Sequence, residues 1–220
     1  MSASDAMVFV VDDDMAVRRS LARLIRSADL NVETFTSARE FLDHLPSART
    51  GCIVLDVRMP GMTGPELFDQ MAGKGISLPV VFLTGHGNVP TSVRAMKKGA
   101  VDFLLKPVDD EVLLQAIRRA VARHVSQQAR EQRRQDIEER LLRLSARERE
   151  VMEYVIRGDL NKQIAADLRI SEKTVKVHRG RVMAKMEAGS VAELVRLCEA
   201  AGIQPRQENT LSQRGKDRQF

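Results

Sequence analysis

Short apolar runs alternate with amphipathic stretches through the first half of the chain. The runs lie at 7–11, 31–35 (the weakest), 52–55, 78–83 and 101–105. Runs of this length predict strands buried on both faces, as the strands of parallel sheets are. Apolar positions at helical spacing follow at 15–28, at 38–45, from about 65, at 89–98 and from Asp109 or Asp110. Five strand–helix repeats predict a parallel sheet with helices on both faces.

Polar residues stand where these predicted strands end. They are Asp12 and Asp13 after the first run, Asp56 after the third, Thr84 after the fourth and Lys106 after the fifth. Ligands bind beyond the carboxyl ends of strands in open α/β sheets, so one shared site is expected there. Three packed carboxylates repel one another unless a cation joins them, and such oxygen ligands suit Mg²⁺. An aspartate can also accept a phosphoryl group, although Asp56 on its own could equally be an acid that starts a loop.

This set of residues closely resembles the receiver domain of bacterial two-component response regulators, over roughly residues 5–122. The likeness rests on the aspartates that end the first run, on Asp56 followed by Met-Pro-Gly at 59–61, on Thr84, and on Lys106-Pro107. It implies a flavodoxin-like sheet with strand order 2-1-3-4-5. It also implies that Asp56 is phosphorylated by a sensor histidine kinase, and that Thr84 and Lys106 contact the phosphoryl group.

The same resemblance implies a magnesium site and a switch residue. Mg²⁺ would be held by Asp13, Asp56, the backbone carbonyl of Arg58 and, through water, Asp12. Phe103 fits the position of the family's aromatic switch residue, with a plain core role on a buried strand as the alternative. The third acid of the cluster, Asp14, is expected to start the following helix.

The stretch 126–140 is almost wholly polar, and no Gly or Pro occurs in 108–157. Opposite charges four residues apart, such as Arg134 and Glu138, support a solvated helix. A helix continuing from about 110 to 140 would span about 45 Å. A loosely ordered linker is the alternative, because an all-polar helix gains little from tertiary packing.

Four short helices are predicted beyond residue 144. Their starts are the capping boxes of Ser145 with Glu148 and of Ser190 with Glu193, together with Asn161 and Ser171, and glycines follow the first and last helices at 158 and 202. Helices this short, joined by small turns, fit a helix-turn-helix module.

The third of these helices has an outward face that suits DNA better than solvent. Its outward residues are Lys173, Val177, Gly180, Arg181 and Ala184, with Lys176 at the flank, and its inward residues are Val175, His178, Val182 and Met186. Small and apolar side chains ringed by cations permit close approach to a duplex, where an exposed methyl can meet thymine. A merely solvated charged face is the alternative.

This half of the chain resembles the LuxR-type helix-turn-helix of the NarL/FixJ response regulators, over about 144–200. The likeness runs through Leu-Ser-Ala-Arg-Glu-Arg-Glu at 144–150, Asn-Lys-Gln-Ile-Ala at 161–165, Thr-Val-Lys-Val-His-Arg at 174–179 and Ala-Glu-Leu-Val-Arg at 192–196. It implies dimer contacts from the fourth helix and base contacts from Lys176 and Val177. It implies DNA-backbone contacts from Lys162, Lys173, Thr174, Arg179 and Lys185, and the outward face adds Arg181 to the DNA-binding set.

Two residues depart from that family's pattern. Asp159 stands where relatives usually carry an apolar residue, and Leu160 beside it is expected to compensate. Gly180 replaces what is often a larger DNA-contacting side chain, which leaves the base preference open.

Charge is unevenly distributed between the halves of the 220-residue chain. Residues 1–122 carry 14 Lys/Arg against 15 Asp/Glu, and the remainder carries 21 against 15, so their net charges are −1 and +6. Residues 162–185 alone hold seven basic side chains against two acids, as expected for a domain that faces a polyanion. No apolar run approaches a membrane span or a secretory signal, and the two cysteines form no metal or disulfide pattern, so the cytosol is expected.

The sequence therefore predicts a receiver domain at 5–122, a helical linker at 123–143, an all-α four-helix helix-turn-helix domain at 144–202 and a disordered tail at 203–220. The predicted function is a cytoplasmic, phosphorylation-controlled transcriptional regulator that dimerises when phosphorylated and is not a turnover enzyme. Its predicted partners are double-stranded DNA and a sensor histidine kinase, with RNA polymerase as a further candidate and no membrane.

Two other functions stay open: a Mg²⁺-dependent phosphatase or phosphotransferase that uses Asp56 in turnover, and a DNA-binding protein regulated without phosphate. Two further phosphate-handling classes are set aside. A dinucleotide-binding domain needs G-x-G-x-x-G after the first strand, where Asp-Asp-Asp-Met stands at 12–15. A haloacid-dehalogenase-like phosphatase needs a second acid two positions after Asp56, where Arg58 stands.

Overall fold

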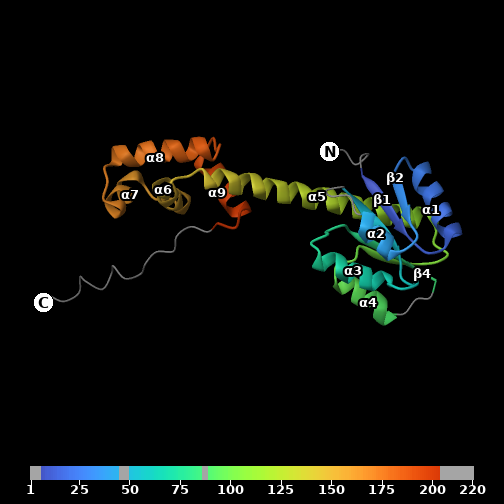
Figure 1. Ribbon diagram of the computed structural model, residues 1–220. Coiled ribbons are helices and arrows are strands. Elements are labelled where there is room, and N and C mark those ends of the chain that lie inside the picture. Colours follow the sequence, from blue (N-terminus) through green and yellow to red (C-terminus); the bar gives the residue numbers. More distant parts are fainter. Residues whose placement is uncertain (1–5, 45–49, 86–88, 204–220) are drawn as a thin grey trace. The chain divides into compact units, whose positions relative to one another are not determined.

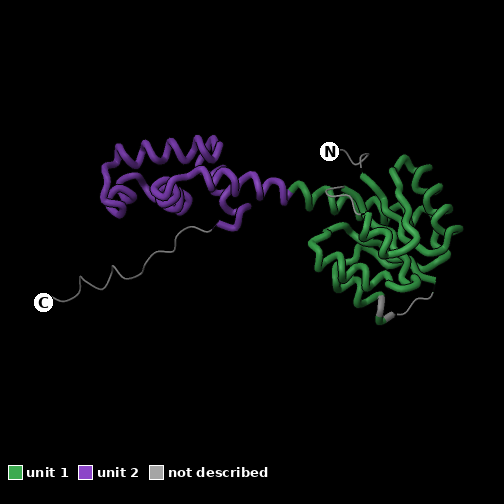
Figure 2. Tube along the Cα trace, viewed as in Figure 1, with its two compact units in different colours: residues 1–129 green, residues 130–220 purple. Residues whose placement is uncertain are grey.

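The computed structural model describes residues 6–44, 50–85 and 89–203. The tail predicted at 203–220 therefore lies outside the described residues, apart from its first position. The chain divides into two compact units, residues 1–129 and 130–220, which Figure 2 shows in different colours.

The first unit is built on a five-stranded sheet (Figure 1). Its strands are β1 (Met7–Val11), β2 (Asn31–Phe35), β3 (Gly51–Asp56), β4 (Val80–Thr84) and β5 (Asp102–Leu105). They lie in the order β2-β1-β3-β4-β5 and every neighbouring pair is parallel, which confirms the predicted topology. From β1 the chain continues to β2 at one edge of the sheet, and from β3 it continues to β4 toward the other edge, so the strand order reverses between β1 and β3. In such sheets, ligands bind in the crevice beyond the carboxyl ends of these two strands.

Five helices pack on the two faces of this sheet. They are α1 (Met15–Ser27), α2 (Ala38–His44), α3 (Gly64–Gly73), α4 (Val89–Lys97) and α5 (Asp110–Leu142). Successive strand residues point to opposite faces, so Phe9 and Ile53 join a core cluster with α2, α3 and α4. Val8 and Cys52 join the other cluster, with α1 and α5. Burial on both faces is the reason that β3 and β4 appear in the sequence as continuous apolar runs.

Local capping fixes where several of these helices start. Asp14 caps α1, as predicted, because its carboxylate accepts the backbone N–H groups of Ala16 and Val17. Thr63 and Glu66 form a capping box at the start of α3. Helix α5 begins at Asp110, and Asp109 caps it, because Asp109 Oδ1 accepts the backbone N–H groups of Glu111 and Val112 at 3.0 and 3.1 Å.

Helix α5 is continuous from Asp110 to Leu142, so the predicted linker is helical rather than loosely ordered. Its first half packs on the sheet through an apolar face that includes Leu113 and Ile117. The boundary between the two units falls within this helix, after residue 129 (Figure 2).

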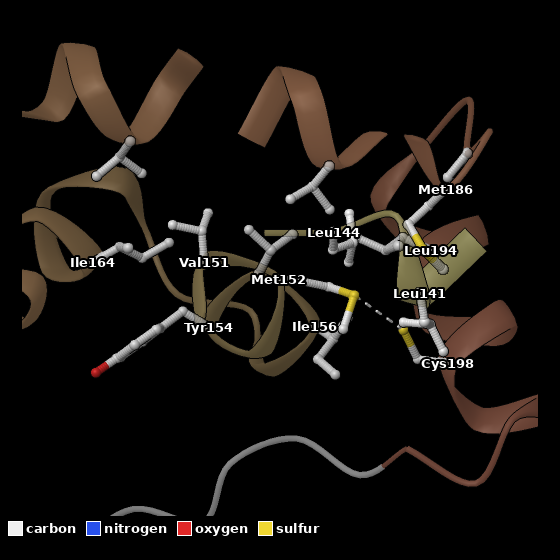
Figure 3. Packing of buried hydrophobic residues seen from close by; sticks show 14 of the residues in the cluster. Leu141, Leu144, Val151, Met152, Tyr154, Ile156, Ile164, Met186, Leu194 and Cys198 are labelled. Atoms are coloured by element: carbon white, nitrogen blue, oxygen red, sulfur yellow. Dashed lines mark hydrogen bonds between the residues drawn. The ribbon is translucent and has the colours of Figure 1, made fainter. Parts of the chain in front are cut away.

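The second unit holds the predicted four helices after α5. They are α6 (Ala146–Arg157), α7 (Asn161–Leu168), α8 (Glu172–Lys185) and α9 (Val191–Ala200). Their inner faces form one hydrophobic cluster, in which Val151, Met152 and Ile164 are buried (Figure 3). The thiol of Cys198 on α9 lies 3.9 Å from the sulfur of Met152 on α6. Three of the four residues predicted to face inward from α8 are fully buried, and His178 is half-buried.

The start of α7 differs from the prediction. Asn161 does not cap this helix, because it is already the first helical residue and Leu160 holds the capping position. The side-chain oxygen of Gln163 accepts the backbone N–H of Leu160 at 2.8 Å. Asn161 Oδ1 accepts instead a hydrogen bond from Arg179 Nη1 on α8, at 3.1 Å. A contact between helices therefore replaces the predicted local cap.

The other three helix starts of this unit follow the prediction more closely. Ser145, Ser171 and Ser190 each accept a backbone N–H from the first turn of the helix that follows. The capping box is reciprocal at Ser145, where Glu148 binds the backbone N–H of the capping residue. It is not reciprocal at Ser190, because Glu193 binds the backbone N–H of Gly189 instead, at 2.9 Å.

Gly51, at the start of β3, leaves no room for a side chain, since an added Cβ would lie 1.8 Å from the carbonyl oxygen of Met7 on β1. Gly51→Ala is expected to lower the free energy of unfolding of the first unit by more than about 2 kcal/mol, because backbone atoms cannot yield to the new methyl group. Gly73→Ala is the matched control, since its Cβ would meet nothing within 4 Å. Urea unfolding followed by circular dichroism measures both, and a Gly51→Ala midpoint equal to that of Gly73→Ala contradicts this close approach of the strands.

Candidate functional site

An ammonium group bridges two carboxylates at the carboxyl edge of the sheet. Asp12 follows β1, Asp56 ends β3 and Lys106 follows β5. Lys106 Nζ lies 2.6 Å from Asp12 Oδ2 and 2.7 Å from Asp56 Oδ1. Parallel strand pairing aligns Asp56 with Leu83 and Thr84 with Leu105, so residues distant in sequence end at the same edge. The structure thus brings together three of the residues that the sequence assigned to one site.

Backbone groups fix the other oxygens of the two carboxylates. The N–H of Asp14 donates to Asp12 Oδ1 and the N–H of Arg58 donates to Asp56 Oδ2, each at 2.9 Å. Both aspartates are buried, with 2% of Asp12 and 7% of Asp56 exposed. Asp56 keeps enough exposure for a small group to reach its carboxylate, while its orientation is fixed from two sides.

Burial and ion pairing shift the pKa values of Asp12 and Lys106 in opposite directions. Burial raises the pKa of Asp12, and the hydrogen bond from Lys106 is the largest effect that opposes this rise. Burial alone would lower the pKa of Lys106, but its hydrogen bonds to Asp12 and Asp56 outweigh burial and raise it. The ammonium therefore stays charged at neutral pH, which suits a group that must meet a phosphate.

Asp13 does not join this cluster, contrary to the expected packing of three carboxylates. Its side chain is exposed, one residue beyond the buried Asp12. Within the described residues, no three His, Cys, Asp or Glu side chains are grouped so that they could hold a metal ion by themselves. The cation that joins the buried acids is the ammonium of Lys106. The magnesium ligands named from the sequence stay a prediction.

Thr84 and Phe103 lie on adjacent strands, where Thr84 pairs with Leu105 and Phe103 pairs with Phe82. Thr84 ends β4 with 1% of its surface exposed, and its backbone carbonyl accepts the N–H of Lys106 at 2.8 Å. Phe103 on β5 is half-buried, and its ring centroid lies 5.9 Å from that of Phe82 on β4. Phe103 is therefore neither fully buried nor fully exposed. Its role as a switch residue stays a prediction.

One contact at this edge was missed by the sequence reasoning. Arg18 Nη1 on α1 donates to the backbone carbonyl of Asp12 at 2.6 Å. Arg18 thereby ties the first turns of α1 to the end of β1. No sequence signal marks this contact, because arginine on an exposed helix face is ordinary.

A second candidate site is the outward face of α8. The residues predicted to point outward are all exposed, namely Lys173, Lys176, Val177, Gly180, Arg181 and Ala184. Val177 is a large apolar side chain that leaves 48% of its surface in solvent. On the opposite face of the helix, Val175, Val182 and Met186 are completely buried. The helix is therefore anchored by one side and presents a basic face with small residues on the other.

Three residues named for DNA-backbone contacts also hold the second unit together. The hydroxyl groups of Thr174 and Ser171 lie 2.8 Å apart at the start of α8. Arg179 binds Asn161, as described above. Lys185 Nζ lies 2.6 Å from the buried Glu148 Oε2 and donates to the carbonyl of Arg143 at 3.0 Å. The predicted phosphate contact of Lys185 must therefore share its ammonium with Glu148, whereas Lys162 is exposed.

Leu160 does not compensate for Asp159, contrary to the expectation from sequence. Its side chain leaves 69% of its surface exposed and fills no place in the core. Asp159 is accommodated by an ion pair with Arg157 on α6, with Arg157 Nε 2.6 Å from Asp159 Oδ2. A charge pair thus replaces apolar packing at this turn.

A parallel sheet with this acidic edge, followed by a helix-turn-helix unit with a basic face, defines a receiver-type regulator that binds DNA. Comparison with family models agrees for both parts. Residues 8–118 match the response regulator receiver domain, and residues 142–198 match the luxR family of bacterial regulatory proteins.

Relatives extend this agreement over nearly the whole chain. The transcriptional regulatory protein FixJ of Azorhizobium caulinodans is 47% identical over 203 residues, which make up 92% of this chain and 96% of that protein. Nodulation protein W of Bradyrhizobium diazoefficiens is 46% identical, over 92% of this chain and 89% of that protein. The solved structure of the response regulator StyR matches with a TM-score of 0.82 and 46% identity, over 89% of this chain and 98% of that one.

The chain belongs to the NarL/FixJ family of response regulators. It is a transcriptional regulator with a receiver domain, which implies a sensor kinase as partner, and a LuxR-type domain, which implies DNA. Among the helices that the structure describes, none has the length and apolar character needed to cross a bilayer.

The ion pair of Glu148 with Lys185 predicts a pH dependence of stability. The hydrogen bonds from Lys185 and from the backbone of Ser145 lower the pKa of Glu148 from 4.5 to about 2. A pKa that is lower in the folded state contributes stability above the unfolded value, and this contribution is lost as the pH falls from about 4.5 toward about 2. Glu148→Gln should lower the melting temperature by about 5 °C at pH 7, and the difference from wild type should shrink across that window.

Thermal melts at several pH values between 7 and 2 measure this difference. Glu199→Gln on α9 removes one exposed carboxylate and serves as the control, with little change expected at any pH. If the difference in melting temperature between Glu148→Gln and wild type stays constant from neutral to acid pH, the proposed stabilisation by an ion pair between α6 and α8 is contradicted.

Proposed function

We propose that this response regulator accepts a phosphoryl group on Asp56 from a sensor histidine kinase and thereby controls its binding to specific DNA sequences. The observation that carries the proposal is the bridge from Lys106 to Asp56 and Asp12 at the carboxyl edge of the sheet. A bacterial regulator that acts on chromosomal DNA works in the cytoplasm, and we propose that location.

The transfer makes one bond and breaks one. An oxygen of the Asp56 carboxylate attacks the phosphorus of a phosphohistidine, and the N–P bond breaks with its electron pair left on the imidazole nitrogen. The product is an aspartyl phosphate. The two negative charges of its phosphoryl group are stabilised if the ammonium of Lys106 turns from the carboxylate to a phosphoryl oxygen and the hydroxyl of Thr84 donates to another.

The residues at this edge suit magnesium as the cofactor. Asp13, Asp56, the carbonyl of Arg58 and, through water, Asp12 would hold the ion. Mg²⁺ keeps several waters and takes only one or two carboxylates, so a site without three grouped acids still suits it. When bound, the ion supplies positive charge that the two carboxylates and the incoming phosphoryl group require.

Phosphorylation is proposed to shift an existing equilibrium rather than to create a new fold. The half-buried Phe103, on the strand adjacent to that of the buried Thr84, is the residue we propose to move. The phosphorylated receiver would then pair with a second copy. Pairing links two DNA-binding domains, so that once one domain has bound its half of a two-part DNA site, the second binds at a raised effective concentration. RNA polymerase is the further partner that we propose.

A turnover enzyme that uses Asp56 as an intermediate is the main rival. A regulator retains its phosphoryl group for minutes or longer after the donor is removed, whereas a phosphatase releases phosphate continuously. The exposed basic face of α8 favours the regulator, because a phosphatase has no use for a DNA-binding face.

Intact-mass measurement tests the acceptor directly. With Mg²⁺ and a small phosphodonor, wild type should gain the mass of one phosphoryl group and Asp56→Asn should gain none. Asp43→Asn on α2 is the control, since that exposed acid pairs only with Arg39 among the described residues, and it should be labelled as wild type is. Labelled Asp56→Asn, or an unlabelled wild type, contradicts the proposal.

DNA competition assays test the roles assigned on α8. Lys176→Ala is expected to weaken specific binding by about 1–3 kcal/mol and to alter the base preference, since it removes a base contact. Lys173→Ala should weaken all sequences alike and reduce the salt slope by about one, since it removes a phosphate contact. Equal losses on every sequence for both variants would show that the division of roles is wrong.

A further inference from the structure

Four of the seven residues that line a pocket on the surface of the first unit are arginines. The pocket has a volume of about 600 Å³ and lies between α1 and the edge strand β2. Its lining includes Arg18, Arg19, Arg23 and Arg26 of α1, with Thr34 of β2 opposite them. Pockets of 300–1,000 Å³ are of the size that takes small molecules.

The charge of this pocket is not balanced by acids around it. Helix α1 contains no Asp or Glu between Met15 and Ser27. Arg19, Arg23 and Arg26 are exposed, and within the described part of the chain none of them forms an ion pair. The contrast is α5, where Arg134 pairs with both Glu131 and Glu138.

Glu40, an acid whose charge interacts with that of Arg18, is already engaged by other groups. Glu40 on α2 interacts with Arg18 at long range, but its Oε2 accepts the backbone N–H of Thr36 at 2.7 Å and the Thr36 hydroxyl at 2.6 Å. Arg18 itself donates to the carbonyl of Asp12. Like charges spaced three and four residues apart, as in Arg19, Arg23 and Arg26, destabilise a helix. An anion bound in the pocket would offset this repulsion.

We propose that this pocket binds a ligand that carries two or more linked phosphates. Each guanidinium presents a planar fork of donors that matches phosphate oxygens two at a time, and several forks suit several adjacent phosphates. A concave pocket of this volume fits a small ligand better than a DNA duplex, which a convex basic helix such as α8 fits. The free polyphosphate chain and the phosphates of a nucleotide share this chemistry.

Isothermal titration of the full-length protein with inorganic tripolyphosphate tests the site. The titration is done in EDTA without Mg²⁺, so that phosphotransfer at Asp56 takes no part and the result is independent of the proposed function. Wild type should bind one equivalent saturably, with an affinity that falls as salt is added. Arg19→Ala/Arg23→Ala should lose at least tenfold in affinity.

The control removes the same charge elsewhere. Arg130→Ala/Arg133→Ala takes two exposed arginines from α5 and should bind tripolyphosphate as wild type does. The circular dichroism spectrum and the urea midpoint of Arg19→Ala/Arg23→Ala should equal those of wild type, which shows that this variant is folded. Equal losses in the two double variants would mean diffuse attraction to net charge and would overturn the proposal.

Two further titrations define the ligand class. ATP that binds as tightly as tripolyphosphate places the recognition in the phosphates alone, and ATP that binds at least tenfold tighter identifies a nucleotide as the source of those phosphates. Both results support the proposal. A hexaglutamate peptide that binds as tightly as tripolyphosphate would overturn it, because the pocket would then select an acidic protein segment. Adenosine, which lacks phosphate, should not bind.

Discussion

The hydrogen bonds of one ammonium group hold the receiver's functional edge together. Lys106 binds Asp12 and Asp56, two carboxylates that are almost completely buried and would otherwise repel each other. Two carboxylates and one ammonium leave one formal negative charge at the edge. The remaining negative charge suits the cation and the phosphoryl acceptor that we propose for this edge.

The parallel sheet makes this balance attainable. Strands β1, β3 and β5 are separated by long stretches of chain, yet their carboxyl ends meet because every neighbouring pair runs in parallel. Two-sided burial holds β3 in register, and the close approach of Gly51 to Met7 leaves no room for a side chain between β1 and β3. The positions of the functional side chains at this edge therefore depend on how closely the core beneath them is packed.

Helix α5 gives the two units a common element. Its first half contributes Leu113 and Ile117 to a core of the receiver, and its last turns contribute Ile137 and Leu141 to the core of the DNA-binding unit. The stretch between these halves contains neither glycine nor proline, the residues that most often kink or end a helix. One helix therefore contributes residues to the hydrophobic core of each unit.

The sequence alone determined the elements and most of their ends, although not the cap of α7, because apolar periodicity and capping residues act within a few positions of one another. It placed Asp56 at the end of a buried strand and separated the buried from the exposed face of α8. Only the tertiary structure decided which side chains meet across long separations. It left Asp13 in solvent, it gave Lys185 a second role with Glu148, and it gathered the arginines of α1 beside an edge strand. Such contacts depend on how whole elements pack, and no local pattern encodes that packing.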